Sequence, residues 1–225
     1  CTWMLLGRSK LPEAEPAWAE NCVSESELKK QIMQNFLAEG EKPTPMKVQQ
    51  VYKKIASSRE IRATIATLHH LGSQVEYVSV DVTDTEALET KLTNVSQRMG
   101  KVTGIIHGAG NLADKWIENK TEQDFENVYA AKVEGLENLL RCIPKSQLEY
   151  LVLFSSVAGF FGSAGQSDYA LANEILNKSA HQIKQENPSC HVVAINWGPW
   201  DSGMVTAELK KAFAARNIEV IPIEV

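Results

Sequence analysis

Cysteine is scarce in this chain, and no two cysteines have the spacing of a metal-binding or redox motif. The 225 residues include four cysteines that lie far apart: Cys1, Cys22, Cys142 and Cys190. Such spacing fits neither a disulfide framework nor a zinc site, so we expect reduced thiols and a cytoplasmic location. His69, His70 and His107 have no acidic residues at ligand spacing, and we therefore expect no metal.

Long apolar runs and an excess of positive charge are also absent. No run approaches the length of a membrane span, and the start lacks the order of a signal peptide. The formal net charge is -5, which argues against electrostatic binding to nucleic acid or anionic lipid. With 44% hydrophobic and 23% charged residues, residues 1–225 are expected to form a single soluble domain.

Short apolar runs alternate with longer amphipathic segments along the chain. This alternation is typical of a parallel sheet covered by helices, and therefore of an α/β fold. Between the first strand and a helix near Arg59 to Leu71 lies a long connection, which predicts a helical insertion over residues 10–58. Within it, Ser24 and Glu27 form a capping-box pattern for one helix, and a second is expected from Pro45 to Ala56. The expected strands are Thr2 to Leu6, Val75 to Val80, Val102 to His107, Tyr150 to Phe154 and His191 to Trp197, with a possible sixth from Glu219 to Ile223.

A lysine interrupts the apolar stripe of a predicted helix over Thr121 to Ile143. Lys132 lies in line with Tyr129 and Leu136, where a buried ammonium needs a specific reason. A lysine that extends to the edge of the core is the alternative. Both interpretations remain open from this helix alone.

Three further polar residues are expected at the carboxyl edge of the sheet. Ser156 directly follows a strand, where open parallel sheets bind ligands, although a serine there can also simply cap a helix. Tyr169 and Asn173 lie four residues apart on one face of a predicted helix from Gln166 to Lys184. Their phenol and amide should point to the same edge as Ser156, together with Lys132.

The runs Ser155-Ser156-Val157-Ala158-Gly159 and Gly165 to Asn173 resemble the active-site stretch of ketoreductase domains in modular synthases. Most short-chain dehydrogenases carry Y-x-x-x-K, whereas synthase ketoreductases carry asparagine at that lysine position and the lysine on the preceding helix. Asn173 and Lys132 match this exchange. The likeness covers nearly the whole chain, and the insertion is most similar to that of polyunsaturated fatty acid and glycolipid synthases. It implies a Rossmann-like, doubly wound parallel sheet.

The resemblance also implies a role for each catalytic residue. Tyr169 would donate a proton to the ketone oxygen, and Ser156 would bind the substrate carbonyl. Lys132 would lower the pKa of the phenol toward operating pH and bond the nicotinamide ribose. Asn173 would hold a water or backbone link that orients the lysine. The expected reaction reduces a 3-ketoacyl thioester on an acyl carrier protein, beside other domains of the same synthase.

The cofactor is expected to be NADPH. Arg8 follows the first strand, where a guanidinium suits the 2′-phosphate and an acidic residue would suit NAD; an ordinary surface arginine is the alternative. No G-x-G-x-x-G turn occurs in the chain, so we expect it to begin at the family's second strand, with an incomplete pyrophosphate site and low stability alone. The other expected cofactor contacts are Ser9, Asp81, Val82, Gly108, Ala109, Gly110, Pro199 and Trp200.

Residues that flank the expected cleft predict the stereochemistry. Leu112 and Asp114 match the L-x-D pattern of ketoreductases that yield the 3R alcohol, and Phe161 replaces the tryptophan of those that yield the opposite alcohol. Leu112 and Asp114 could instead be ordinary loop residues. Two other functions also stay open: an NADP-binding module without catalysis, and a structural remnant of a ketoreductase.

Overall fold

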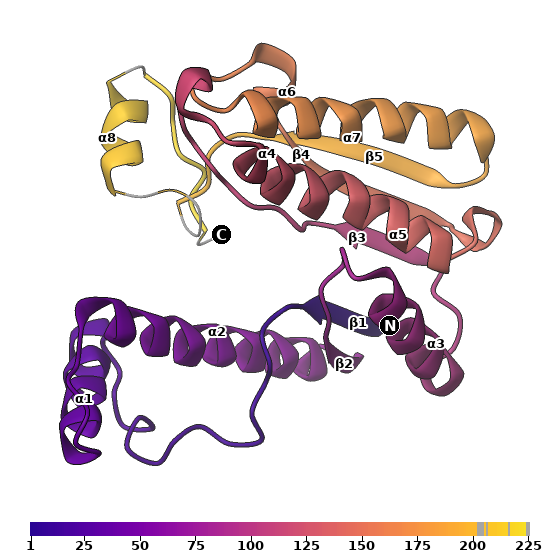
Figure 1. Ribbon diagram of the computed structural model, residues 1–225. Coiled ribbons are helices and arrows are strands. Elements are labelled where there is room, and N and C mark those ends of the chain that lie inside the picture. Colours follow the sequence, from indigo (N-terminus) through magenta and orange to yellow (C-terminus); the bar gives the residue numbers. More distant parts are fainter. Residues whose placement is uncertain (202–204, 206, 216, 224–225) are drawn as a thin grey trace. The chain divides into compact units, whose positions relative to one another are not determined.

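The computed structural model describes residues 1–201, 205, 207–215 and 217–223. The chain divides into two compact units, residues 1–81 and 82–225, and each is described by itself. All described strands pair in parallel, β1 with β2 in one sheet and β3-β4-β5 in the other (Figure 1). The five expected strands and the parallel α/β class are therefore confirmed.

The first unit combines a strand pair with two helices. It contains β1 (Thr2–Gly7), α1 (Glu25–Ala38), α2 (Pro45–His70) and β2 (Gln74–Ser79). An apolar cluster packs the segment before α1 against both helices and includes Ala19, Leu28, Ile32, Val48 and Ile55. Arg59 on α2 fastens the same segment, because its guanidinium binds the Glu15 carboxylate and the carbonyls of Ala19 and Cys22.

Local sequence signals explain how these helices begin. The Ser24 hydroxyl accepts from the Glu27 amide while the Glu27 carboxylate accepts from the Ser24 amide, so the expected capping box is confirmed. Thr44 caps α2 and Pro45 occupies its first turn. The expected division of this region into two helices is wrong. Residues 46–70 contain neither proline nor glycine, so no residue ends the helix near Ala56, and α2 continues to His70.

The second unit is built on the sheet β3 (Gly104–His107), β4 (Tyr150–Ser156) and β5 (His191–Trp197). The segment around Glu219 to Ile223 does not form a sixth strand. It makes only a single parallel bridge, between Ile221 and Trp200. The helices are α3 (Thr85–Met99), α4 (Glu122–Tyr129), α5 (Gly135–Cys142), α6 (Val157–Phe161), α7 (Ser167–Glu186) and α8 (Ala207–Ala214), with 3-10 turns η1 (Ile117–Asn119) and η3 (Lys145–Gln147).

The expected helix over Thr121 to Ile143 contains a π-helical turn. The turn η2 (Ala130–Glu134) joins α4 to α5 without ending the helix. A π turn adds a residue to the helix and shifts the residues that follow, a feature often found at functional sites. The segments α4 and η2 pack beside α7 (Figure 1), and η2 contains Lys132.

Candidate active site

Helix α7 carries the tyrosine and asparagine of the expected site on its buried face. Tyr169 packs against an apolar cluster of Val128, Val133 and Ala172. Asn173 follows one turn later and is 0% exposed. Farther along the same face, Leu176 and Ile183 are buried, so the face of the helix expected from the sequence is confirmed. Residues of α4 and η2 therefore pack against the Tyr169 side chain.

Lys132 lies in the core instead of reaching to its edge. The residue is 4% exposed, and its Nζ donates to the carbonyl oxygen of Phe154 on β4 at 2.9 Å. The same Nζ lies 5.5 Å from the centroid of the Tyr169 ring, a distance at which a cation and an aromatic face attract. Burial lowers the pKa of Lys132 from 10.5 to about 8. The structure thus supports the interpretation that Lys132 is buried for a specific reason, and not the one in which it extends to the edge of the core.

His107 holds the backbone of Lys132. Its Nε2 lies 2.8 Å from the Lys132 carbonyl oxygen, and the ring is 2% exposed. Burial lowers the pKa of His107 to about 4, so the imidazole is neutral near pH 7. A carbonyl oxygen only accepts, so Nε2 carries the proton and donates it to Lys132. The sequence suggested a packing or surface role for His107, and its link to Lys132 could not be read from it.

Ser156 and Asn173 both lie within hydrogen-bonding reach of the Tyr169 phenol. Ser156 ends β4, and its hydroxyl accepts from the Ala158 amide at 3.2 Å, so it also serves as a helix cap, the alternative that the sequence left open. The Asn173 side chain donates to the Tyr169 carbonyl at 2.7 Å, and its backbone carbonyl accepts from the Ser155 hydroxyl. The Asn173 Oδ1 is buried and has no partner among the described residues. Its backbone link therefore runs to Tyr169, whereas a link that orients Lys132 was expected.

The pKa of Tyr169 moves opposite to the expected direction. Burial raises it, and Ser156 and Asn173 only partly counteract this by hydrogen bonding. The negative charge of Asp114 raises it further. The expectation that Lys132 lowers this pKa is wrong here, because loss of hydration dominates at a buried phenol. Tyr169 consequently stays protonated near neutral pH.

The L-x-D segment lies beside the start of α7. Asp114 accepts a hydrogen bond from the Gln166 amide group at 2.9 Å, and the Lys115 backbone amide donates to the Gly165 carbonyl at 3.0 Å. Ala113, between Leu112 and Asp114, packs on the cluster that contains Tyr169. Phe161 is 79% exposed, and its ring contacts Phe160. The structure thus brings the L-x-D segment to the tyrosine, whereas no described contact connects Phe161 to it.

The expected cofactor residues belong to both units. Arg8, Ser9 and Asp81 lie in the first unit, where the Arg8 carbonyl accepts from the Ser79 hydroxyl and the Ser9 carbonyl accepts from the Tyr77 hydroxyl. That the cofactor residues of both units bind the same NADPH molecule stays a prediction. The second unit contains Val82, Gly108, Ala109, Gly110, Pro199 and Trp200.

Within the second unit, the cofactor candidates line the ends of β3 and β5. Gly108 faces the Phe154 ring, which contacts Trp197, and Trp197 in turn contacts Trp200. The Val82 side chain lies close to Gly135, where an added Cβ would meet its Cγ2 at 2.8 Å. The Val82 carbonyl also accepts a hydrogen bond from Asn138 on α5. These contacts fix Val82 beside the same helix that contains the Lys132 turn.

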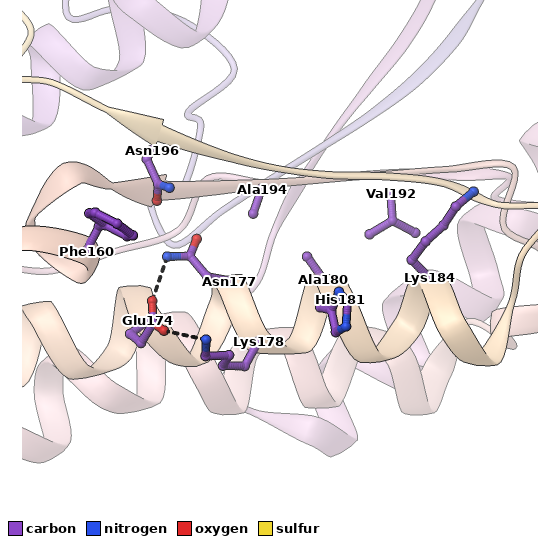
Figure 2. A pocket seen from close by; sticks show the side chains of 10 residues that line it. All are labelled: Phe160, Glu174, Asn177, Lys178, Ala180, His181, Lys184, Val192, Ala194 and Asn196. Carbon is purple, nitrogen blue, oxygen red and sulfur yellow. Dashed lines mark hydrogen bonds and ion pairs between the residues drawn. The ribbon is translucent and has the colours of Figure 1, made fainter.

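A cavity of about 580 Å³ lies along α7 but does not include the candidate catalytic residues. Figure 2 shows Glu174 on this helix bonded to Asn177 and Lys178, with Asn196 of β5 nearby. Neither Tyr169 nor Asn173 lines this cavity. The candidate site is therefore assigned from the side-chain geometry around Tyr169 and not from this cavity.

The described part of the chain offers no group of three metal-ligating side chains and no helix long and apolar enough to cross a membrane. All four cysteines are free.

Comparison with known proteins identifies relatives of this chain. The chain is 39% identical to one subunit of the polyunsaturated fatty acid synthase of Thraustochytrium sp. over 228 residues, which is 99% of this chain but 8% of that subunit. It is 32% identical to polyketide synthase PksN of Bacillus subtilis over 75% of this chain and 3% of that protein. The chain therefore spans only a small part of these relatives.

Solved structures show the same relationship. A ketoreductase from the first module of phoslactomycin biosynthesis in Streptomyces sp. HK803 superimposes with a TM-score of 0.67 at 29% identity, covering 75% of this chain and 38% of the other. A ketoreductase domain from the bacillaene assembly line gives 0.62 at 26% identity, covering 98% and 44%. The sequence model of the KR domain family matches residues 33–202. The chain belongs to the KR domain family of polyketide and polyunsaturated fatty acid synthases, within the Rossmann-like short-chain dehydrogenase/reductase fold.

Proposed function

We propose that this protein uses NADPH to reduce a 3-ketoacyl thioester, presented by an acyl carrier protein, to the 3-hydroxyacyl thioester. The observation that carries the proposal is the buried ammonium of Lys132 over the ring of Tyr169. Burying an ammonium group costs free energy, so its position needs a reason. Here it lies beside a phenol that Ser156 and Asn173 also border. We treat residues 1–225 as one ketoreductase domain with an insertion at 10–58.

Tyr169 is the proposed acid. Reduction of a ketone requires hydride at carbon and a proton at oxygen, and a positioned phenol is a better acid than water near neutral pH. Because burial raises the pKa of Tyr169, the phenol holds its proton until negative charge develops on the substrate oxygen. The Ser156 hydroxyl, next to the phenol, would hydrogen-bond the same oxygen and stabilise that charge in the transition state.

The donors available in the chain fit NADPH. When bound, this cofactor supplies the hydride. Arg8 presents a guanidinium for the 2′-phosphate, and Lys132 presents a buried ammonium for the ribose hydroxyls. Gly7 precedes Arg8 where a Cβ would lie 2.7 Å from the Tyr77 hydroxyl, so a larger residue at position 7 would displace the Tyr77 ring. The further proposed contacts are Ser9, Asp81, Val82, Gly108, Ala109, Gly110, Pro199 and Trp200.

The substrate and its stereochemistry follow from the family and the L-x-D segment. The relatives are multidomain synthases, which supports a substrate tethered to a carrier protein and cooperation with other synthase domains. Asp114 lies close enough to influence the Tyr169 phenol, so Leu112 and Asp114 can guide the ketone as it approaches. We infer a 3R product, consistent with phenylalanine at position 161.

The test is the variant Tyr169→Phe in the intact protein. We expect NADPH-dependent reduction of a 3-ketoacyl thioester to fall at least about a hundredfold, in line with the usual contribution of general acids, with nearly unchanged NADPH affinity. Tyr129→Phe is the matched control, because its ring stacks on Phe125 and packs on the same apolar cluster as Tyr169, but it is not the proposed acid. Retained activity in Tyr169→Phe would refute the role of the phenol. Saturable NADPH binding without turnover in the wild type would instead identify a binding module.

A further inference from the structure

A buried ion pair lies next to the proposed catalytic tyrosine. The Lys120 Nζ is 2.8 Å from the Asp168 carboxylate, and the two side chains are 7% and 0% exposed. Asp168 directly precedes Tyr169 and accepts a hydrogen bond from the Tyr169 backbone amide at 2.9 Å. The charge on Asp168 is therefore fixed at the first turn of α7, and Lys120 neutralises it.

Lys120 also binds the segment that contains Leu112 and Asp114. Its ammonium donates to the backbone carbonyl of Ala113 at 2.7 Å. One side chain thus connects the centre of the L-x-D segment to the residue that precedes Tyr169. Lys120 itself follows the short turn η1, directly before α4, so three separate segments meet at its Nζ.

Two further hydrogen bonds connect the same segments. The Gln166 side chain binds Asp114, and the Lys115 amide donates to the Gly165 carbonyl. Gly165 has a positive φ of 78°, a backbone conformation that side chains disfavour. These links lie nearer the surface, where water competes with them, whereas the Lys120 bonds are buried.

Stability alone does not account for such a pair. Removing two charges from water costs about as much as their attraction returns, so a buried ion pair is often no better than an apolar one. Its distinctive effect is geometric, because each charge strongly penalises any position in which it loses its partner. Here the ion pair constrains the distance between Ala113 and Tyr169.

We propose that Lys120 and Asp168 are positioning residues that hold the L-x-D segment against the start of α7 and so fix the face of the ketone presented to the cofactor. The proposal rests on the proposed reductase function. It adds residues outside the L-x-D pattern itself: a lysine and an aspartate 48 positions apart in sequence. Loosening this contact should let the substrate enter in both orientations while leaving Tyr169, Lys132 and Ser156 in place.

The decisive variant is the double substitution Lys120→Met with Asp168→Asn. Either change alone leaves a buried charge without its partner and can unfold the domain. The double variant removes both charges, and asparagine can still accept from the Tyr169 amide. We expect it to fold with nearly the wild-type Tm and to reduce the 3-ketoacyl thioester, but to lose selectivity between the 3R and 3S products by about tenfold or more.

A second measurement does not depend on activity. The Lys115 amide, which donates to Gly165, should exchange with deuterium about tenfold faster in the double variant, since local opening controls such exchange. Lys115→Met is the matched control. It removes one lysine from the same segment, but the Lys115 side chain is 46% exposed, so we expect wild-type selectivity and exchange.

The outcomes separate the two proposals. Wild-type selectivity and exchange in a folded, active double variant would overturn the positioning role, because a merely structural pair predicts that result. Loss of selectivity together with faster exchange would support it. An inactive wild type would refute the reductase function and with it the steering of the ketone, while the exchange rates would still show whether Lys120 and Asp168 hold the segment.

Discussion

The buried Lys132 makes the stability of this protein depend on pH in a way that one variant can isolate. Burial lowers the pKa of this ammonium from 10.5 to about 8. Below pH 8 both the folded and the unfolded chain carry the proton, and the folded state bears the full cost of burying the charge. Between pH 8 and 10.5 only the unfolded chain keeps it, so the free energy of unfolding rises with pH.

The size of this effect follows from the pKa difference. Each unit corresponds to about 1.4 kcal/mol, so the full change amounts to about 3 kcal/mol across the window. Lys132→Met keeps the length of the side chain but cannot titrate. The variant lacks the hydrogen bond from Lys132 to the Phe154 carbonyl at every pH. This loss changes the difference in free energy of unfolding between the two proteins by a constant. Only the Lys132 ammonium makes that difference vary with pH.

Urea denaturation of the wild type and Lys132→Met at pH 7 and pH 9.5 measures the change. We expect the wild type to gain about 2 kcal/mol relative to the variant over this range. Lys115→Met controls for the general loss of a positive charge, because Lys115 is exposed. If the two stability profiles run parallel from pH 7 to 9.5, Lys132 is not desolvated as the structure indicates, and its assignment as a buried functional ammonium fails.

Three further predictions concern other single residues. In Arg8→Ala, the preference for NADPH over NADH should fall about tenfold or more, because a charged hydrogen bond contributes about 1.5 to 3 kcal/mol; equal kcat/KM ratios in variant and wild type would contradict this. In His107→Phe, the Lys132 carbonyl loses its donor, so kcat should fall. Because the pKa of His107 is lowered to about 4, the free energy of unfolding of the wild type should fall by about 3 kcal/mol as the pH drops from 6.5 to 4. Denaturation of His107→Phe should not show this fall. Gly135→Ala places a Cβ 2.8 Å from Val82 and should lower stability by about 1 to 3 kcal/mol; an unchanged Tm would show that Val82 moves freely.

Periodic patterns predicted those parts of the structure that are determined locally. Apolar runs located the strands, and the Ser24 and Glu27 pair located the start of α1. The apolar stripe around Lys132 was also informative, because a charge on a core face conflicts with the pattern of its own helix. What it could not show is the π turn, which contacts His107 of β3 and packs against α7, because periodicity does not record contacts between distant segments.

Contacts between distant segments account for what the sequence did not predict. The partner of His107 is a backbone carbonyl 25 residues away, and any residue has such a carbonyl. Lys120 and Asp168 are ordinary charges in the sequence, and only the fold brings them together and buries them. The pKa of Tyr169 was predicted in the wrong direction for a similar reason. The expectation weighed the charge of Lys132 but not the loss of water around the phenol.

The departures from local rules in the second unit concentrate around one side chain. A π turn, a buried ammonium and a buried ion pair each reduce stability or leave it unimproved when taken alone. All three contact Tyr169 or a residue next to it: Lys132 lies over its ring, and Asp168 binds its amide. Independent structural accidents would be scattered through the core. Because they converge on one phenol, we attribute them to selection for the position of Tyr169, which is the group that the proposed reaction requires to be fixed most closely.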